Sequence, residues 1–148
     1  MKKLVCLVAI ICAVSYTQAQ EPVTWKFAVK KIDAKTFEIH LSANLDEGWH
    51  LYSQFTPKGG PVPTSVSFAK NPLLVFEGIV KEAGDMEKHF EKLFGVQVFQ
   101  FSNRVDFAQT VKLKSNVKTN LSGTVEFMVC NDEMCLPPKE VPFSLSLK

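Results

Sequence analysis

The sequence predicts an all-β domain, an immunoglobulin-like β-sandwich, that follows an export signal. Three observations predict this architecture. Apolar residues recur at every second position along most of the chain, and turn-forming residues separate these stretches into about eight short strands. At the N-terminus, an apolar segment follows two lysines. No repeat or heptad pattern competes with this interpretation.

The N-terminal segment has the three parts of a secretory signal. Lys2 and Lys3 form a basic start, residues 4–14 form an apolar run, and residues 17–19 form a small-residue exit with cleavage expected after Ala19. The apolar run is shorter than the ~20 residues that a transmembrane helix requires. We therefore expect a signal peptide over residues 1–19 and one exported, non-membrane-spanning domain over residues 20–148. Cys6 and Cys12 are expected to leave with the signal.

The charge balance of the mature chain excludes one class of partner. The signal contains two of the 17 basic residues and none of the 15 acidic ones, so basic and acidic residues balance once it is removed. Nucleic-acid binding depends on a basic excess or cluster, so we expect no nucleic-acid partner. About 130 residues suffice for a hydrophobic core, so stability does not require a disulfide.

Alternation and turn residues place the predicted strands in order. Trp25, Phe27 and Val29 alternate with polar neighbours, and the same period of two returns in later stretches. Turn formers such as residues 58–61 and 102–103 separate them. The predicted strands cover residues 25–29, 37–43, 65–68, 73–80, 96–101, 105–113, 123–130 and 141–147. Residues 85–95 lack strict alternation, and we expect one helical turn or an ordered loop there.

Cys130 and Cys135 are the two cysteines outside the signal, separated by four residues. If the chain turns back between them, they face each other across a hairpin. Their Cα atoms would then lie roughly 4.5–5.5 Å apart, within the disulfide range of about 4.4–6.8 Å. Because it closes a loop of only six residues, such a disulfide would stabilise the folded state by only ~2 kcal/mol. The pair is either a small structural bond or a redox centre.

Strand parity and local charge favour the redox interpretation. Val125, Phe127 and Val129 fit the inward face, which predicts that Cys130 points outward and lies near the surface. Acidic neighbours follow Cys130, so nothing local favours a thiolate. Such a thiol stays quiet until a partner docks.

A zinc site is the weaker alternative. The cysteines supply two ligands, and His40, His50 and His89 are possible partners, but no second close cysteine or histidine pair is present. Each histidine is interpreted as an ordinary strand or loop residue. We expect no metal and no cofactor, and the motifs of serine hydrolases and phosphate-binding loops are absent from the sequence.

Residues 125–138, from Val125 to the Pro137-Pro138 pair, resemble the N-terminal periplasmic domain of the thiol:disulfide interchange protein DsbD. The shared pattern is a strand, a cysteine, an acidic loop, a second cysteine and a double proline. Two weaker segments, residues 48–52 and 93–95, are similar to an early aromatic segment and to the cap loop of that family.

The resemblance implies an immunoglobulin-like fold and a function in thiol–disulfide exchange. Cys135 would form the mixed disulfide with partner proteins, and Cys130 would resolve it. Tyr52 would pack near the pair. A cap loop that shields the sulfurs would contain Glu91, the carboxylate near them, Phe94 or else Leu93 as the cover, and Gly95 at the turn.

The function predicted from the sequence is therefore a periplasmic thiol–disulfide oxidoreductase that acts as an electron-transfer domain. Electrons would come from a membrane-embedded thiol reductase and pass to periplasmic thioredoxin-like proteins. Family members usually continue into a transmembrane domain, so we expect the reductase to be a separate chain. The alternative is an exported β-sandwich binding or assembly module whose disulfide only pins a hairpin.

Overall fold

The computed structural model describes residues 21–148, which form nine strands and no helix. The predicted signal peptide, residues 1–19, lies outside the described residues. The strands are β1 (Val23–Lys31), β2 (Thr36–Leu45), β3 (His50–Tyr52), β4 (Ser65–Phe68), β5 (Leu74–Glu91), β6 (Val96–Leu113), β7 (Thr119–Phe127), β8 (Val129–Cys130) and β9 (Lys139–Leu147). Among the described residues, no helix could span a membrane.

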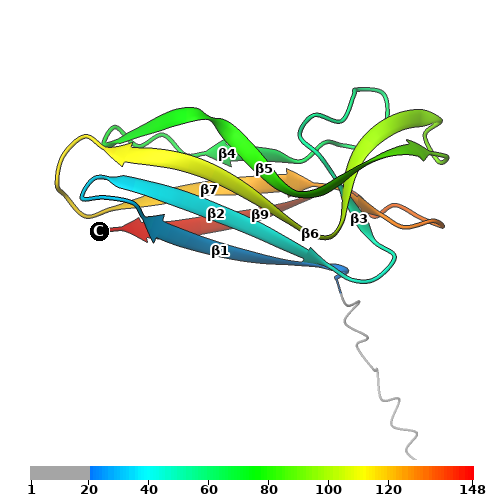
Figure 1. Cartoon of the computed structure of the whole chain (residues 1–148), viewed down its shortest axis with the longest axis horizontal. Helices are drawn as coiled ribbons and strands as arrows, with labels where there is room; N and C mark the ends of the chain where they lie inside the picture. Colours follow the sequence, from blue (N-terminus) through cyan, green and yellow to red (C-terminus); the bar gives the residue numbers. More distant parts are fainter. Residues whose placement is uncertain (1–20) are drawn as a thin grey trace, which may run out of the picture.

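Two antiparallel sheets face each other, as Figure 1 shows. The larger sheet has the order β1-β2-β6-β3-β8, with β5 added alongside β6, and the smaller sheet has the order β4-β7-β9. Side chains from both sheets fill the space between them, and Ile39, Phe107, Val125 and Phe127 are each at most 2% exposed. The predicted immunoglobulin-like β-sandwich is confirmed.

β6 is one strand of 18 residues where the sequence predicts two. Residues 104–112 of β6 pair with β2, and residues 100–102 pair with β3. Asn103, with φ of 62°, lies at the change of partner, where the pairing with β5 also shifts register. The predicted turn at residues 102–103 is therefore a bulge, because Asn tolerates the left-handed conformation inside a continuing strand.

Residues 85–91 continue strand β5, so the prediction of a helical turn or loop there is wrong. Residues 86–91 pair with residues 96–101 of β6 in a hairpin that extends beyond the sandwich core. Every residue from Asp85 to Phe90 is exposed. A strand with two solvated faces has no buried set of residues, so its sequence shows no alternation.

The hairpin tip and the cysteine segment lie at the same end of the molecule. Figure 1 shows the tip, near residue 90, beside the loop that follows β8, with the C-terminus at the opposite end. β3, which lies between β6 and β8, connects the two. The fold thus brings together three segments that are distant in sequence.

Candidate functional site: a disulfide beside a buried polar cluster

Cys130 and Cys135 form a disulfide across a tight hairpin, with their Cα atoms 4.0 Å apart. The backbone N–H of Asn131 donates to the carbonyl of Met134 (2.9 Å), and the N–H of Leu136 donates to the carbonyl of Val129 (3.0 Å). The Asn131 side-chain oxygen accepts two more backbone N–H groups within the loop. An asparagine that bonds its own backbone two or three residues on stabilises such a turn, so the sequence folds into this hairpin locally.

The two cysteines differ in exposure, and the prediction of an outward Cys130 is wrong. Cys130 is 0% exposed, whereas Cys135 is partly exposed. The sequence predicts one strand over residues 123–130, but β7 ends at Phe127 and β8 belongs to the other sheet. The side of β8 that carries Cys130 is covered by a small cluster that includes Tyr52, Val98 and Met128.

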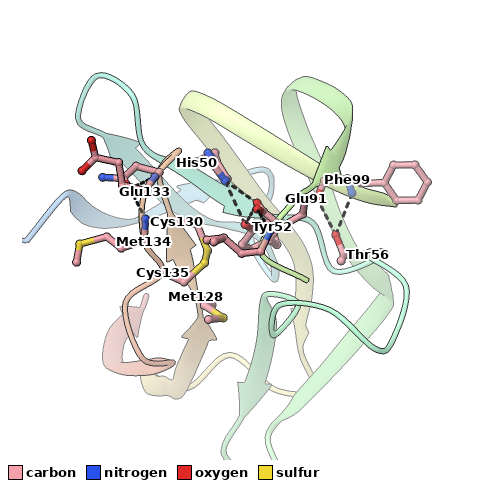
Figure 2. A network of polar contacts seen from close by, with 12 residues as sticks. His50, Tyr52, Thr56, Glu91, Phe99, Met128, Cys130, Glu133, Met134 and Cys135 are labelled. Atoms are coloured by element: carbon pink, nitrogen blue, oxygen red, sulfur yellow. Dashed lines mark hydrogen bonds and ion pairs between the residues drawn. A yellow bond between two sulfur atoms is a disulfide. The ribbon is translucent and has the colours of Figure 1, made fainter. Parts of the chain in front are cut away.

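Glu91, Tyr52 and His50 form a buried polar cluster next to the disulfide (Figure 2). The Tyr52 hydroxyl donates to Glu91 Oε2 (2.7 Å), and His50 Nε2 lies 3.1 Å from the Tyr52 hydroxyl and 3.3 Å from the same carboxylate oxygen. The other oxygen, Oε1, accepts the backbone N–H of Leu93 (3.3 Å). His50 and Tyr52 share a face of β3 because they are two residues apart.

Burial and hydrogen bonding together set the charge states of this cluster. Burial lowers the pKa of His50 despite the nearby carboxylate, which favours the neutral ring. Burial also raises the pKa of Tyr52, and donation to Glu91 adds to this. Burial alone would raise the pKa of Glu91, but the bonds from Tyr52, Leu93 and His50 outweigh it and lower the pKa. The cluster therefore holds an ionised carboxylate between two neutral rings.

The cluster lies close to one of the two sulfurs. The Cys130 sulfur, a His50 ring nitrogen and a Glu91 carboxylate oxygen all lie within 4.8 Å of one another. Glu91 and Tyr52 are thus brought to the disulfide. The sequence predicts that His50 is an ordinary strand or loop residue, whereas the structure places it in this cluster. Its position two residues before Tyr52 was the available signal, because it places both side chains on one face of a strand.

The predicted cap loop is the tip of the β5–β6 hairpin. Glu91 ends β5, and its carbonyl accepts the N–H groups of Phe94 (3.3 Å) and Gly95 (2.8 Å). Gly95 has φ of 68°, a conformation that glycine adopts without strain and that closes the turn. The tip is therefore short and held by its own backbone.

Leu93, rather than Phe94, faces the cysteine loop. Leu93 lines a cavity of about 220 Å³ together with His50, Glu91, Asn131 and Asp132. Phe94 lies on the side of Gly60, where a Cβ atom added to Gly60 would come within 3.9 Å of the Phe94 Cβ. Both side chains keep substantial exposure, 52% for Leu93 and 37% for Phe94.

The three histidines do not converge. His40 lies on β2 and contacts Asp106 (2.7 Å) and Glu38 (2.9 Å), in a separate cluster. The His89 ring centroid lies 6.3 Å from that of His50. His50 is the one of the three that lies within 4.8 Å of a cysteine sulfur and a carboxylate oxygen together.

Solved structures with this fold include three bacterial domains. The N-terminal periplasmic domain of ScsB from Proteus mirabilis is 18% identical, with a TM-score of 0.59 over 86% of this chain and 47% of that chain. The reduced DsbD N-terminal domain of Neisseria meningitidis is 14% identical, with a TM-score of 0.50 over 76% of this chain and 85% of that chain. A Neisseria meningitidis complex of the DsbD and PilB N-terminal domains gives 12% identity and a TM-score of 0.52, covering 86% and 87% of the two chains.

At these identities the structural likeness shows the fold, and this chain spans about half the length of the ScsB domain. A sequence search of the curated proteins finds no significant match. The family model described as thiol:disulfide interchange protein DsbD, N-terminal, matches residues 15–147. Because that match covers nearly the whole chain and includes both cysteines, the chain belongs to the DsbD N-terminal domain family.

Proposed function

We propose that this protein is a periplasmic thiol:disulfide interchange domain that passes electrons through Cys130 and Cys135. The donor would be a membrane-embedded thiol reductase, and the acceptors would be thioredoxin-like proteins. The observation that carries the proposal is the asymmetry of the pair, a partly exposed Cys135 bonded to a fully buried Cys130 beside a polar cluster. A purely structural disulfide in a hairpin requires neither the unequal exposure of its sulfurs nor an adjacent polar cluster.

The difference in exposure supports a separate role for each sulfur. The Cys135 thiolate attacks the partner's disulfide, forms a mixed disulfide and releases one partner thiolate. The Cys130 thiolate then attacks the Cys135 sulfur, which restores the intramolecular disulfide and releases the second thiolate. Two electrons and two protons pass to the partner. The sulfur that a partner must reach is the exposed one, and the sulfur that resolves can remain buried.

The polar cluster supports the resolving role of Cys130. Glu91 is ionised and lies within 4.8 Å of this sulfur, and its charge opposes a second negative charge there. A ring nitrogen of the neutral His50 lies within the same distance and would accept the Cys130 proton once the two groups come into hydrogen-bond contact. Cys130 would thus remain a thiol until the mixed disulfide has formed.

The β5–β6 tip would act as the lid of the pair. Glu91 and Gly95 anchor it, Leu93 lies on the cavity next to the cysteine loop, and Phe94 lies on its outer side. A partner that contacts Cys135 must displace Leu93 or approach beside it. The Neisseria meningitidis complex of the DsbD and PilB N-terminal domains supports a second protein domain as the partner.

Trapping the mixed disulfide tests the roles of the two sulfurs. Reduced Cys130→Ala protein, incubated with an oxidised thioredoxin-like protein, should accumulate a covalent adduct through Cys135, visible by mass spectrometry without reductant. The matched variant Cys135→Ala should form much less adduct, because its remaining sulfur is buried. Absence of an adduct from Cys130→Ala, or equal yields from both variants, would count against the assignment.

The reduction potential separates this function from the alternative binding or assembly module. A redox-cycling pair should equilibrate with a dithiol buffer of known potential within the range of periplasmic reductants. A potential well below about −300 mV would indicate a structural bond instead.

A further inference from the structure

We propose that reduction of the Cys130–Cys135 disulfide creates a zinc site whose four ligands are both cysteine sulfurs, His50 and Glu91. The oxidised protein would have no such site, so zinc would bind only the reduced protein and stabilise the reduced state. The proposed zinc site depends on the geometry of the cluster and not on which partner the protein reduces.

The first three ligands already lie together. The Cys130 sulfur, a His50 nitrogen and a Glu91 oxygen are within 4.8 Å of one another, and all three residues are buried. Zinc bonds of about 2.0–2.3 Å in a tetrahedron place ligand atoms ~3.3–3.8 Å apart. The separation of 3.3 Å between His50 Nε2 and Glu91 Oε2 meets this requirement. The sulfur needs to move by only about 1 Å, which a side chain released from its disulfide can do by rotation.

Cys135 supplies the fourth ligand. It faces Cys130 across the hairpin, with Cα atoms 4.0 Å apart, and the loop hydrogen bonds of Asn131 and Leu136 do not involve the sulfurs. The hairpin therefore keeps the two sulfurs adjacent after the disulfide opens. Two thiolates, one imidazole and one carboxylate form a borderline-soft donor set that suits zinc better than magnesium or calcium.

The chemistry explains why only the reduced state would bind. A thiolate is the metal ligand, and in the disulfide each sulfur is bonded to the other. Opening the bond takes two electrons and two protons from a dithiol reductant. Zinc then replaces the two thiol protons, which pass to water. The neutral His50 ring carries its single proton on Nε2 while it bonds to Glu91, so zinc binding at Nε2 requires that proton to move to Nδ1 by exchange with water. Because both sulfurs are then occupied, bound zinc would block oxidation of the pair.

Neighbouring groups orient the carboxylate and leave a route for the ion. Figure 2 shows Tyr52 and Glu91 next to the disulfide, with the Tyr52 hydroxyl bonded to the carboxylate. Leu93 N–H holds the second oxygen. Such outer hydrogen bonds fix ligand orientation in metal sites. The cavity of about 220 Å³, lined by His50, Glu91 and Asp132, leads from the surface to the cluster.

Cobalt provides a test that needs no variant. The processed protein, reduced with a phosphine that does not bind metals, is titrated with Co²⁺. The expected result is one equivalent bound, with the strong visible bands of tetrahedral cobalt and a sulfur-to-cobalt charge-transfer band in the near ultraviolet. The oxidised protein should show neither. A spectrum of octahedral cobalt, or the same spectrum in both redox states, would overturn the proposal.

Zinc affinity, measured by competition with a chromophoric chelator, tests the two ligands outside the cysteine pair. In the reduced protein, His50→Ala and Glu91→Ala should each weaken binding at least about tenfold. His89→Ala is the matched control, since His89 borders the same cavity but stands outside the ligand cluster, and should leave affinity nearly unchanged. Unchanged affinity in His50→Ala, with a circular dichroism spectrum like that of the parent, would refute the assigned ligand set.

Zinc should also protect the reduced pair. With one equivalent of zinc, alkylation of the two thiols by iodoacetamide should slow markedly, and a chelator should restore the rate. An unchanged alkylation rate would show that the sulfurs are not ligands. This readout is independent of partner exchange, so failure of the zinc site would leave the proposed interchange function intact.

Discussion

Glu91 is the residue on which the buried polar cluster depends. It is 5% exposed, and its two oxygens accept hydrogen bonds from the Tyr52 hydroxyl and the Leu93 backbone, with His50 also in contact. A buried carboxylate is tolerated when several donors replace its water. Removing it would leave buried polar groups of Tyr52 and His50 without their partner.

Substitution of Glu91 should therefore reduce stability in a graded way. We expect Glu91→Ala to lower the free energy of unfolding of the oxidised protein by about 1–3 kcal/mol, because it leaves buried polar groups unsatisfied. Glu91→Gln keeps an acceptor for Tyr52 and should cost less. Denaturant unfolding measures both, with the exposed Glu87→Ala on the same strand as control. Equal losses for Glu91→Ala and Glu87→Ala would contradict the role of the cluster.

His40 gives the sandwich a pH-dependent contribution. Its ring contacts Asp106 on the neighbouring strand β6 and Glu38 on its own strand. The hydrogen bond to Asp106 is the main reason that the pKa of His40 is raised above 6.5. A raised pKa in the folded state means that folding favours the protonated ring, so this stability is present below pH 6.5 and is lost as pH rises through the folded pKa.

The variant His40→Gln should therefore lose more stability at pH 6 than at pH 9. We expect the loss in free energy of unfolding caused by this substitution to be about 1 kcal/mol larger at pH 6 than at pH 9. The value is modest because the site is partly open to solvent. Urea unfolding at both pH values measures this. The same loss at pH 6 and pH 9 would mean that the charged ring contributes nothing beyond packing.

At the scale of elements, the β5–β6 hairpin is the part of the sandwich that brings further residues to the cysteine segment. Both strands have 18 residues, and their ends extend past the core to place Glu91 and Leu93 over the cysteine segment. The tip is closed by bonds to the Glu91 carbonyl and by Gly95 at positive φ. Because the side chains of Leu93 and Phe94 are largely exposed, displacing them would break few contacts with the core.

Truncation of the tip residues tests which one shields the sulfurs. Leu93→Ala should increase the rate at which the reduced pair reacts with a small disulfide oxidant by severalfold, because it removes the side chain next to Asn131 and Asp132. Phe94→Ala should have a smaller effect. Met86→Ala is the control, because Met86 is an exposed apolar residue on β5 that lies before Glu91 and away from the tip. A faster rate in Phe94→Ala with no change in Leu93→Ala would transfer the shielding role to Phe94.

For the molecule as a whole, the disulfide is peripheral to stability. Large buried side chains from both sheets form the main core, whereas the disulfide closes a loop of six residues that hydrogen bonds already hold. The chain-entropy estimate for such a loop is only ~2 kcal/mol. A domain that keeps its fold in both redox states can cycle between them.

Reduction should therefore lower the free energy of unfolding by about 2 kcal/mol and leave the β-sheet circular dichroism spectrum unchanged. Parallel urea titrations of the oxidised and reduced proteins measure the difference. The Cys130→Ala/Cys135→Ala protein serves as a second reference without thiols. Unfolding of the domain on reduction would show that the bond is a structural requirement and would support the binding-module alternative.

The sandwich and the hairpin around the cysteines were predictable because both depend on local patterns. Alternation of apolar and polar residues along residues 37–43 and 105–113 predicts strands with one buried face. Asn131 between two closely spaced cysteines indicates a tight turn. Strands in other environments were not visible. Residues 85–91 have two solvated faces, and His50–Tyr52 is a three-residue strand buried throughout, so neither alternates.

The sequence by itself determined the fold class, the cysteine hairpin and, through the family resemblance, the residues to examine. Only the tertiary structure decided that Cys130 is buried, because that depends on β8 leaving the sheet of β7 and pairing with β3. It alone also brought His50 and Glu91 to the sulfur, from strands 41 residues apart. Contacts between distant segments follow from how sheets stack and how far a hairpin projects, and no local pattern in the chain encodes those distances.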